Sequence, residues 1–210
     1  MRYTIVSQGE SRSFPQGDAF LDGAGDDGEI VVYLGSARFR PDPSRTAVLV
    51  ELGTECLGVH TGEGQGDEGS NVLGFARWRN GADAPSDLVE LVRQPATAET
   101  AIAAATGLFE SAGLTVAPCA DQAGRIIDRL VRPKYNAALR MLDEGLASAA
   151  DLDLTCRLGL GYPEGPIERV VRGGLAHHHD VTRALFEVTG AAAYAPARRA
   201  VVAKQRERVG

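Results

Sequence analysis

Several scarcities narrow what this chain can be. The 210 residues include only three cysteines, Cys56, Cys119 and Cys156, which are widely spaced and form no CxxC pair. This excludes a disulfide scaffold and a cysteine-rich zinc site. No uninterrupted apolar run reaches the ~18–20 residues that a membrane span needs. Residues 1–14 reach Arg, Gln and Glu too early for the apolar region of a signal peptide. We therefore expect a cytoplasmic protein that does not engage a membrane.

Positive charge is also in short supply. There are 22 Lys and Arg against 28 Asp and Glu, which gives a net charge of −6 and a sequence pI near 5.3. Such a balance disfavours generic binding to a phosphate backbone, so we expect no nucleic-acid partner. Apolar residues make up 44% of the chain, which is enough to bury a core. The length suits one large domain or two small ones.

The first half of the chain alternates short β-rich runs with Gly-rich polar stretches. The apolar runs lack strict alternation, as expected of strands that are covered on both faces. The expected strands are Tyr3–Val6, Ile30–Leu34, Ala47–Leu52, Val72–Phe75, Leu88–Val92 and Leu114–Ala117. A helix is expected over Thr97–Ser111, with Thr97 as N-cap and Gly113 as C-cap. Strand, helix and strand form a βαβ unit, which implies a partly parallel sheet.

The second half reads as helical. Apolar residues recur at three- and four-residue steps over Ile127–Leu146, which predicts one long helix with Pro133 inside it. Gly145 or Ser148 then marks a turn. Further helices are expected near Ala149–Leu158, Ile167–Val171, Leu175–Val188 and Pro196–Arg208. These patterns predict a partly parallel α/β sheet over residues 1–118, followed by an all-α domain over 119–210. Residues 62–69 (GEGQGDEG) are expected to form a flexible acidic loop.

The glycine loop of a dinucleotide site is missing. That loop needs three spaced glycines after the first strand, so that the backbone can approach a pyrophosphate at a helix N-terminus. Here the strand is followed by SQGESR, in which only Gly9 is present and Glu10 would repel a phosphate. Asp22 or Asp26 stands where a ribose-binding acid would be expected, but both lie in a Gly-rich stretch. The sequence thus predicts no ordinary NAD site.

Histidines and basic residues offer weaker signals. Consecutive helical residues point about 100° apart, so His177–His179 cannot converge on one metal ion, and a solvated or interface-lining run is favoured. His60 is either a general base at a strand end or a surface residue. The basic tail over 196–208 would contact CoA phosphates or nucleic acid, or be a solvated helix face, which is favoured. Cys119 and Cys156 are expected in the core.

The second half carries a more specific pattern. The segment DQAGRIIDRL at 121–130 is followed, in a fixed order, by Pro133, Asn136 and the Gly- and Pro-rich GLGYPEGPIE at 159–168. This order and spacing resemble the C-terminal helical domain of the 3-hydroxyacyl-CoA dehydrogenases, including the 3-hydroxybutyryl-CoA dehydrogenases. A weaker similarity to the end of that family's Rossmann domain runs back to about Ile30, so the resemblance implies that residues 1–118 form a reduced Rossmann-like α/β sheet. The resemblance implies a homodimer formed through the helical domain, with the Ile127–Leu146 stripe supplying apolar surface.

The family resemblance also implies a mechanism that this chain does not match. In the family, a histidine takes the proton of the 3-hydroxyl while hydride passes to NAD⁺; a glutamate orients the histidine, and a serine and an asparagine hold substrate oxygens. The histidine position is Ala76 here, and the glutamate survives as Glu90. The serine position falls near Glu55, and the asparagine is replaced by Asp128. Glu90 is the one candidate catalytic residue, acting as a base through water, or else a retained strand-end carboxylate.

Three functions remain open from the sequence. The first is a divergent NAD-dependent 3-hydroxyacyl-CoA dehydrogenase of acyl-CoA metabolism, in which a partner subunit supplies the nucleotide site. The second is a catalytically silent relative that binds acyl-CoA. The third is an interaction protein whose helical surface serves an active enzyme. The missing base and the missing glycine loop favour the second and third, with no cofactor expected unless the chain is active.

Overall fold

The computed structural model describes residues 1–63 and 70–209, so residues 64–69 of the expected acidic loop lie outside the described part. The chain divides into two compact units. Unit 1 comprises Met1–Arg79 and Ala84–Arg125, and unit 2 comprises Asn80–Asp83 and Ile126–Gly210. The domain limits expected from the sequence, 1–118 and 119–210, remain a prediction.

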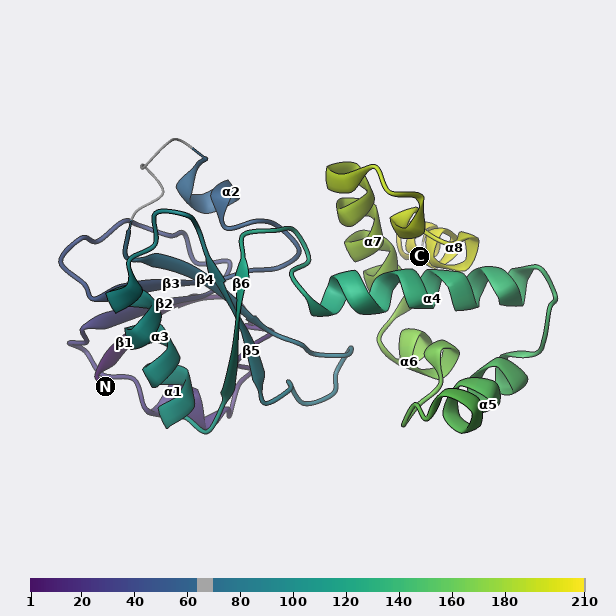
Figure 1. Cartoon of the computed structure of the whole chain (residues 1–210), viewed down its shortest axis with the longest axis horizontal. Helices are drawn as coiled ribbons and strands as arrows, with labels where there is room; N and C mark the ends of the chain where they lie inside the picture. The colour runs from purple at the N-terminus through teal and green to yellow at the C-terminus, as the bar shows by residue number, and fades with distance from the viewer. Residues whose placement is uncertain (64–69, 210) are drawn as a thin grey trace. The chain divides into compact units, whose positions relative to one another are not determined.

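Unit 1 is built on a six-stranded mixed sheet (Figure 1). Its strands are β1 (Tyr3–Gln8), β2 (Ile30–Gly35), β3 (Ala47–Glu51), β4 (Val72–Arg77), β5 (Leu88–Arg93) and β6 (Thr115–Ala120). They lie side by side in chain order, and every neighbouring pair is parallel except β4 and β5, which are antiparallel. All six strands expected from the sequence are present, and the expected parallel β5–helix–β6 unit is confirmed.

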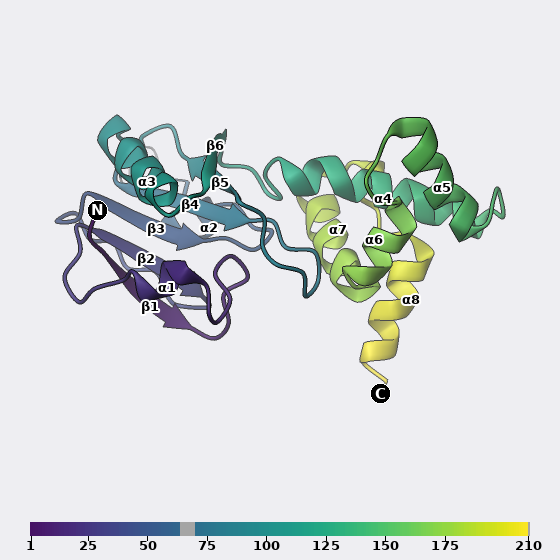
Figure 2. The ribbon, with the colours of Figure 1, turned by 90° about the horizontal axis from the view of Figure 1, so that it is seen from below.

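The two faces of this sheet are covered differently. Ile30, Val32 and Leu34 of β2 point to a face that packs against α3 (Glu99–Ser111) and the single-turn α1 (Ala19–Asp22), as Figure 2 shows for α3. Val31 and Tyr33 point to the opposite face. Among the described residues, that second face is covered by the loop 36–46 and by the four-residue helix α2 (Gly58–Thr61), with no longer helix. A parallel crossover usually supplies a full helix there, so the described residues cover this face thinly.

The start of α3 differs from the prediction. Its N-cap is Ala98, not Thr97, and no side chain caps it. The Thr97 hydroxyl instead accepts a hydrogen bond from the Gln94 amide at 2.9 Å, which closes the preceding turn. At the other end the C-cap is Ala112, and Gly113 follows with φ +80°. The hydroxyl of Thr97 is therefore engaged in a local turn and does not cap the helix that follows.

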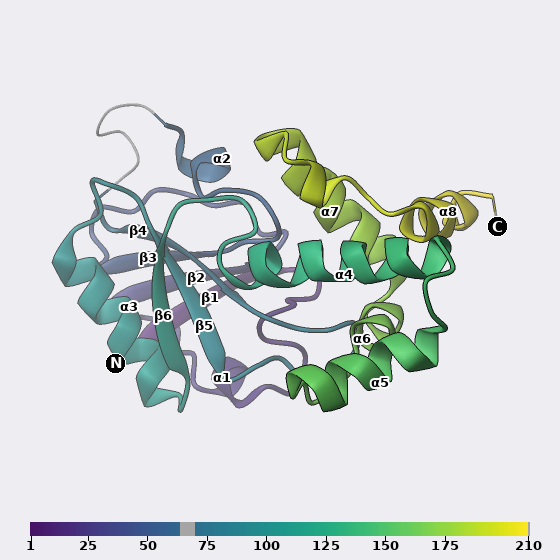
Figure 3. The ribbon, with the colours of Figure 1, turned by 45° about the vertical axis from the view of Figure 1, so that its right-hand side comes forward.

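Unit 2 is helical, with α4 (Ile127–Asp143) running through it between α5 and α6 on one side and α7 and α8 on the other (Figures 1 and 3). The remaining helices are α5 (Ala149–Leu160), α6 (Pro166–Arg172), α7 (Leu175–Thr189), η1 (Ala192–Tyr194) and α8 (Arg198–Glu207). The apolar stripe of α4 packs inside the unit, because Tyr135, Ala138 and Leu139 are buried in its core. The expectation that this stripe supplies a dimer surface is therefore wrong for Tyr135 and Ala138, whereas Leu146, the last residue of the stripe, is 69% exposed.

The Gly- and Pro-rich segment before α6 is fixed by a carboxylate. Asp153 of α5 accepts hydrogen bonds from the amides of Ile167 at 2.8 Å and Glu168 at 3.0 Å, so it satisfies two free N–H groups of the first turn of α6. Gly165 passes so close that a Cβ there would lie 2.2 Å from the Asp153 side chain. Glycine is needed at this position for space.

Gly165→Ala should accordingly destabilise unit 2 by about 1–3 kcal/mol, since the added methyl group displaces the capping carboxylate. The matched control is Gly159→Ala, because a Cβ at Gly159 meets its nearest atom at 3.9 Å. Alanine in place of an unhindered helical glycine should stabilise by about 0.5–1 kcal/mol. Urea unfolding followed by helix circular dichroism measures both, and effects of the same sign in the two variants would contradict the packing argument.

Candidate functional site

The antiparallel pairing of β4 and β5 brings together two of the positions that the family resemblance assigns to the active site. Ala76 and Glu90 are direct partners in this ladder, and their exposed fractions are 6% and 3%. The position that the resemblance assigns to the histidine thus lies beside the position of the orienting glutamate. The methyl group of Ala76 can neither accept nor donate a proton.

Glu90 is held by an arginine that the sequence analysis missed. Arg125 Nε lies 3.4 Å from Glu90 Oε2, and both side chains are only 4% exposed. Arg125 Nη2 also donates to the Gly53 carbonyl at 2.6 Å. Arg125 has φ 48°, in the left-handed region that costs a non-glycine residue roughly 1–2 kcal/mol. The carboxylate of Glu90 is therefore the buried half of an ion pair.

Glu55 lies in the turn after β3, and a distant aspartate fixes that turn. The Asp121 carboxylate accepts hydrogen bonds from the amides of Leu57 at 2.7 Å and Gly58 at 2.9 Å, at the start of α2. α2 then carries His60, whose Nε2 lies 3.3 Å from Glu55 Oε1. The same Glu55 oxygen accepts a hydrogen bond from the Gly53 amide at 3.0 Å. Glu55 and His60 thus form a pair with side chains 35% and 29% exposed.

The electrostatics of Glu55 favour its charged form. Partial burial acts to raise the pKa of this carboxyl, but hydrogen bonds from backbone amides and from His60 outweigh burial, and the net shift is downward. Glu55 is therefore ionised at neutral pH. A carboxylate in this state repels an electron-rich substrate oxygen, whereas a serine would donate a hydrogen bond to it.

Asp128 belongs to a buried polar network in unit 2. Arg132 Nε donates to Asp128 Oδ1 at 2.7 Å, and Arg132 Nη1 lies 3.4 Å from His178 Nδ1. His178 Nε2 lies 3.0 Å from the side-chain oxygen of Asn136. Burial, followed by the charge of Arg132, lowers the pKa of His178 to about 3, so the ring is neutral. His178 is fully buried, so the expectation of a solvated histidine run is wrong for this residue.

The ends of the first strands hold an internal anion. The carboxylate of Glu51, at the end of β3, accepts hydrogen bonds from the amides of Gly35 and Ser13, both at 2.7 Å. It also accepts from the Ser11 hydroxyl at 2.9 Å. In an open α/β sheet, ligands bind beyond the carboxyl ends of the strands. In this chain, amide donors at that edge are already satisfied by a protein carboxylate.

The remaining candidates from the sequence are two cysteines and the basic tail. Cys119 and Cys156 are partly exposed and not fully in the core, and burial, with Glu90 nearby, raises the pKa of Cys119 to about 11. In the basic tail, Arg199 pairs with Asp143 and Lys204 with Asp180, so ion pairs within unit 2 hold part of the helix face that was expected to be solvated.

Within the described residues, no cluster of His, Cys, Asp or Glu could hold a metal ion. No described helix is long and apolar enough to cross a membrane.

Comparisons with known proteins agree with this architecture. Residues 124–208 match the family model of the 3-hydroxyacyl-CoA dehydrogenase C-terminal domain. Pig mitochondrial hydroxyacyl-coenzyme A dehydrogenase is 35% identical over 88 residues, covering 42% of this chain and 28% of the relative. A 3-hydroxybutyryl-CoA dehydrogenase of Mycobacterium tuberculosis is 40% identical over 82 residues, covering 38% and 28%. The chain thus spans just over a quarter of the length of these curated relatives.

Solved structures extend the likeness to both units. FadB2 of M. tuberculosis superposes with a TM-score of 0.72 at 21% identity, covering 86% of this chain and 67% of that one. The 3-hydroxybutyryl-CoA dehydrogenase of Escherichia coli K12 gives 0.71 at 21% identity, covering 89% and 42%. At this identity the structural likeness shows the fold. The resemblance and the fold class, a Rossmann-like sheet followed by a helical domain, are confirmed, and the chain is 3-hydroxyacyl-CoA dehydrogenase-like.

Proposed function

We propose that this chain binds acyl-CoA and acts as a homodimeric or partner protein of acyl-CoA metabolism, without the hydroxyl oxidation implied by its resemblance. One observation carries the proposal. Ala76, at the position that the resemblance assigns to the proton-accepting histidine, pairs across the ladder with Glu90, and Glu90 is engaged by Arg125. Loss of a general base typically costs ~10²–10⁴-fold in rate.

The other positions support the same reading. Glu55 has His60 beside it, and Asp128 has Arg132 beside it. Each acid at a position that the resemblance assigns to the active site therefore has an arginine or histidine partner within the protein. Such pairing fits side chains kept for structure better than side chains free to take up a substrate proton.

The residues present do not fit NAD. A pyrophosphate needs free amide donors and close backbone approach. At the ends of β1 to β3, Glu51 accepts from the Gly35 and Ser13 amides, and Glu10 follows the lone Gly9. Two carboxylates near the strand ends would repel the two phosphates. We assign no step to the dinucleotide.

An acyl thioester has one supporting feature in unit 1. The Nη1 atom of Arg125 is buried and makes no hydrogen bond to any described residue. A buried donor without an acceptor is costly, and a carbonyl oxygen such as that of a thioester would satisfy it. Together with the family resemblance, this donor supports an acyl-CoA ligand.

Exposed apolar side chains support association through the helical unit. On and next to α5, the exposed fractions are 69% for Leu146, 47% for Leu154, 79% for Leu158 and 63% for Leu160. Apolar side chains gathered on one surface element mark interaction sites. We propose that α5 contributes to the homodimer or partner interface.

Titration of the intrinsic fluorescence of Trp78, the single tryptophan, tests the ligand proposal, since Trp78 directly follows β4. Acetoacetyl-CoA should change the emission with saturation, and NADH should leave it unchanged. A saturable response to both would contradict the proposal. Silence toward both, together with co-purification of another enzyme, would restrict the function to that of a partner protein.

The alternative is a divergent active dehydrogenase, favoured by the survival of Glu90 next to the histidine position. It predicts that Ala76→His raises turnover of acetoacetyl-CoA with NADH and that Glu90→Gln lowers it. On our proposal neither substitution produces measurable turnover. Absorbance at 340 nm, which follows NADH, separates the two.

A further inference from the structure

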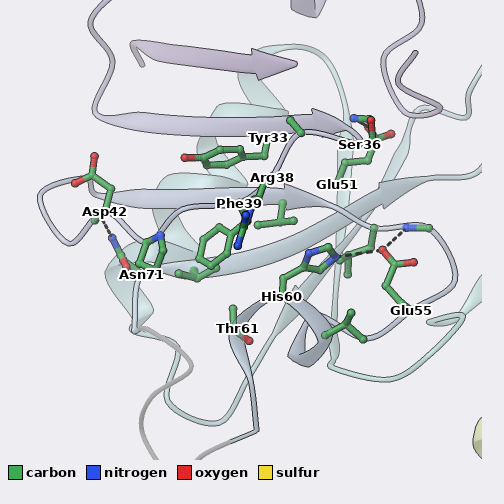
Figure 4. A pocket seen from close by; sticks show the side chains of 18 of the residues that line it. Tyr33, Ser36, Arg38, Phe39, Asp42, Glu51, Glu55, His60, Thr61 and Asn71 are labelled. Carbon is green, nitrogen blue, oxygen red and sulfur yellow. Dashed lines mark hydrogen bonds and ion pairs between the residues drawn. The ribbon is translucent and has the colours of Figure 1, made fainter. Parts of the chain in front are cut away.

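We propose that a cavity on the thinly covered face of the unit 1 sheet binds a small amphipathic monocarboxylate, with Arg38 holding its carboxylate. The cavity has a volume of about 1060 Å³, which is just above the upper end of the usual range of small-molecule sites, ~300–1,000 Å³. Its walls come from β2, β3, the loop 36–46, the turn after β3 and α2 (Figure 4). Glu55 lines this cavity as well, but the proposed carboxylate ligand and its test do not depend on the acyl-CoA proposal.

The sheet side of the cavity is apolar. Tyr33, Val50 and Leu52 project from the second face of the sheet and are buried beneath it. The Phe39 ring, from the loop 36–46, packs edge-on against Tyr33 with the ring centroids 5.9 Å apart. Val59 of α2 lines the same space and is 71% exposed. These side chains suit the apolar body of a ligand, and the aromatic pair favours a planar group.

The carboxylates of the wall are already engaged. Glu51 accepts from two amides and a hydroxyl. Asp42 accepts hydrogen bonds from the hydroxyl and the amide of Ser44 and pairs with Arg45 at 3.1 Å, and these contacts lower its pKa. Glu55 pairs with His60. None of them supplies a counter-charge to a further cation.

Among the described residues of the cavity wall, Arg38 is the cation without a partner. Its exposed guanidinium makes no hydrogen bond or ion pair with any described residue, although it lines the cavity. Arg12, another arginine of the wall, donates to the Arg79 carbonyl at 2.8 Å. A guanidinium next to an apolar floor matches a ligand with one anionic end, and its planar fork matches a carboxylate.

A monocarboxylate fits this wall better than a phosphate. Glu51, Glu55 and Asp42 all lie around the cavity, so a dianion would meet more repulsion than a single negative charge. A neutral amide of the same shape would keep the apolar contacts and lose the pairing with Arg38. The proposal therefore predicts an order of affinity: acid first, then amide, then phosphate.

Isothermal titration calorimetry with 4-phenylbutyrate, 4-phenylbutyramide and 4-phenylbutyl phosphate tests this order. Arg38→Gln should weaken binding of the acid about tenfold and leave the amide unchanged, as expected for loss of one charge-assisted pair. Arg40→Gln is the matched control, because Arg40 is an exposed arginine of the same loop that does not line the cavity. It should leave all three affinities unchanged.

A second variant tests the apolar wall. Val59→Ser should weaken binding of the acid and of the amide by the same factor, about threefold. Because Val59 is 71% exposed, this substitution leaves the core of unit 1 intact. The proposal is overturned if Arg38→Gln leaves the acid affinity unchanged, if Arg40→Gln has an equal effect, or if the amide or phosphate binds as tightly as the acid. Absence of heat with the acid at millimolar concentration also overturns it.

Discussion

Arg125→Met is expected to reduce the free energy of unfolding by about 3–5 kcal/mol, because it leaves the carboxylate of Glu90 buried without its cation. The two side chains are each only 4% exposed, so water cannot replace the arginine without opening the structure. The substitution also removes the hydrogen bond from Arg125 to the Gly53 carbonyl. Methionine retains a similar length and the same backbone cost at φ 48°. Urea unfolding followed by Trp78 fluorescence measures the change in unit 1.

Two further variants isolate the ion pair. Arg93→Met, on β5 with a side chain 54% exposed, should change stability by less than about 0.5 kcal/mol. Glu90→Gln combined with Arg125→Met should recover much of the loss, because the uncompensated charge is gone. A loss below about 1 kcal/mol in Arg125→Met, or no recovery in the double variant, would show that Glu90 does not depend on Arg125.

Unit 2 should lose stability as the pH falls below about 6.5. The ring of His178 is neutral in the folded protein, since burial and then Arg132 lower its pKa to about 3. In the unfolded chain a histidine takes up a proton near pH 6.5. Between these two values the unfolded state binds more protons, so stability falls with falling pH by ~1.4 kcal/mol per unit. Above pH 6.5, His178 no longer makes the stability of unit 2 depend on pH.

Histidine variants identify the source of this slope. Urea unfolding followed by helix circular dichroism at pH 7.5, 6.5, 5.5 and 4.5 should show the decline for the unaltered chain. His178→Gln should be less stable at pH 7.5 and flatter over this range, and His60→Gln, at a partly exposed position, should keep the full slope. An unchanged slope in His178→Gln would contradict the assignment of a buried neutral imidazole.

Local sequence patterns were enough to predict most of the fold. The run IVVYL predicts a strand covered on both faces, and β2 indeed sends Val32 to one core and Val31 to the other. Helical spacing predicts α4, but spacing alone cannot say what its apolar stripe packs against. Tyr135 and Ala138 turned out to face the core of unit 2. Partners of an apolar face are a tertiary property, which a periodic pattern leaves open.

The site was predictable only where the chain keeps the order of a known motif. The resemblance indicated Ala76 and Glu90, and the ladder places them together. The roles of Asp121 and Arg125 were not predicted. Their contacts, of Asp121 with Leu57 and of Arg125 with Gly53, join residues that lie 64 and 72 positions apart in the chain. The Asp128–Arg132 pair could have been found, since acid and base four residues apart meet on one helix face.

We propose that this dehydrogenase-like chain carries out neither the oxidation nor its reverse. The most direct measurement follows NADH at 340 nm with acetoacetyl-CoA and the purified full chain at micromolar concentration. We predict no consumption of NADH above the rate without protein, even where acetoacetyl-CoA saturates the Trp78 signal. Turnover that scales with protein concentration and disappears in Glu90→Gln would contradict the account.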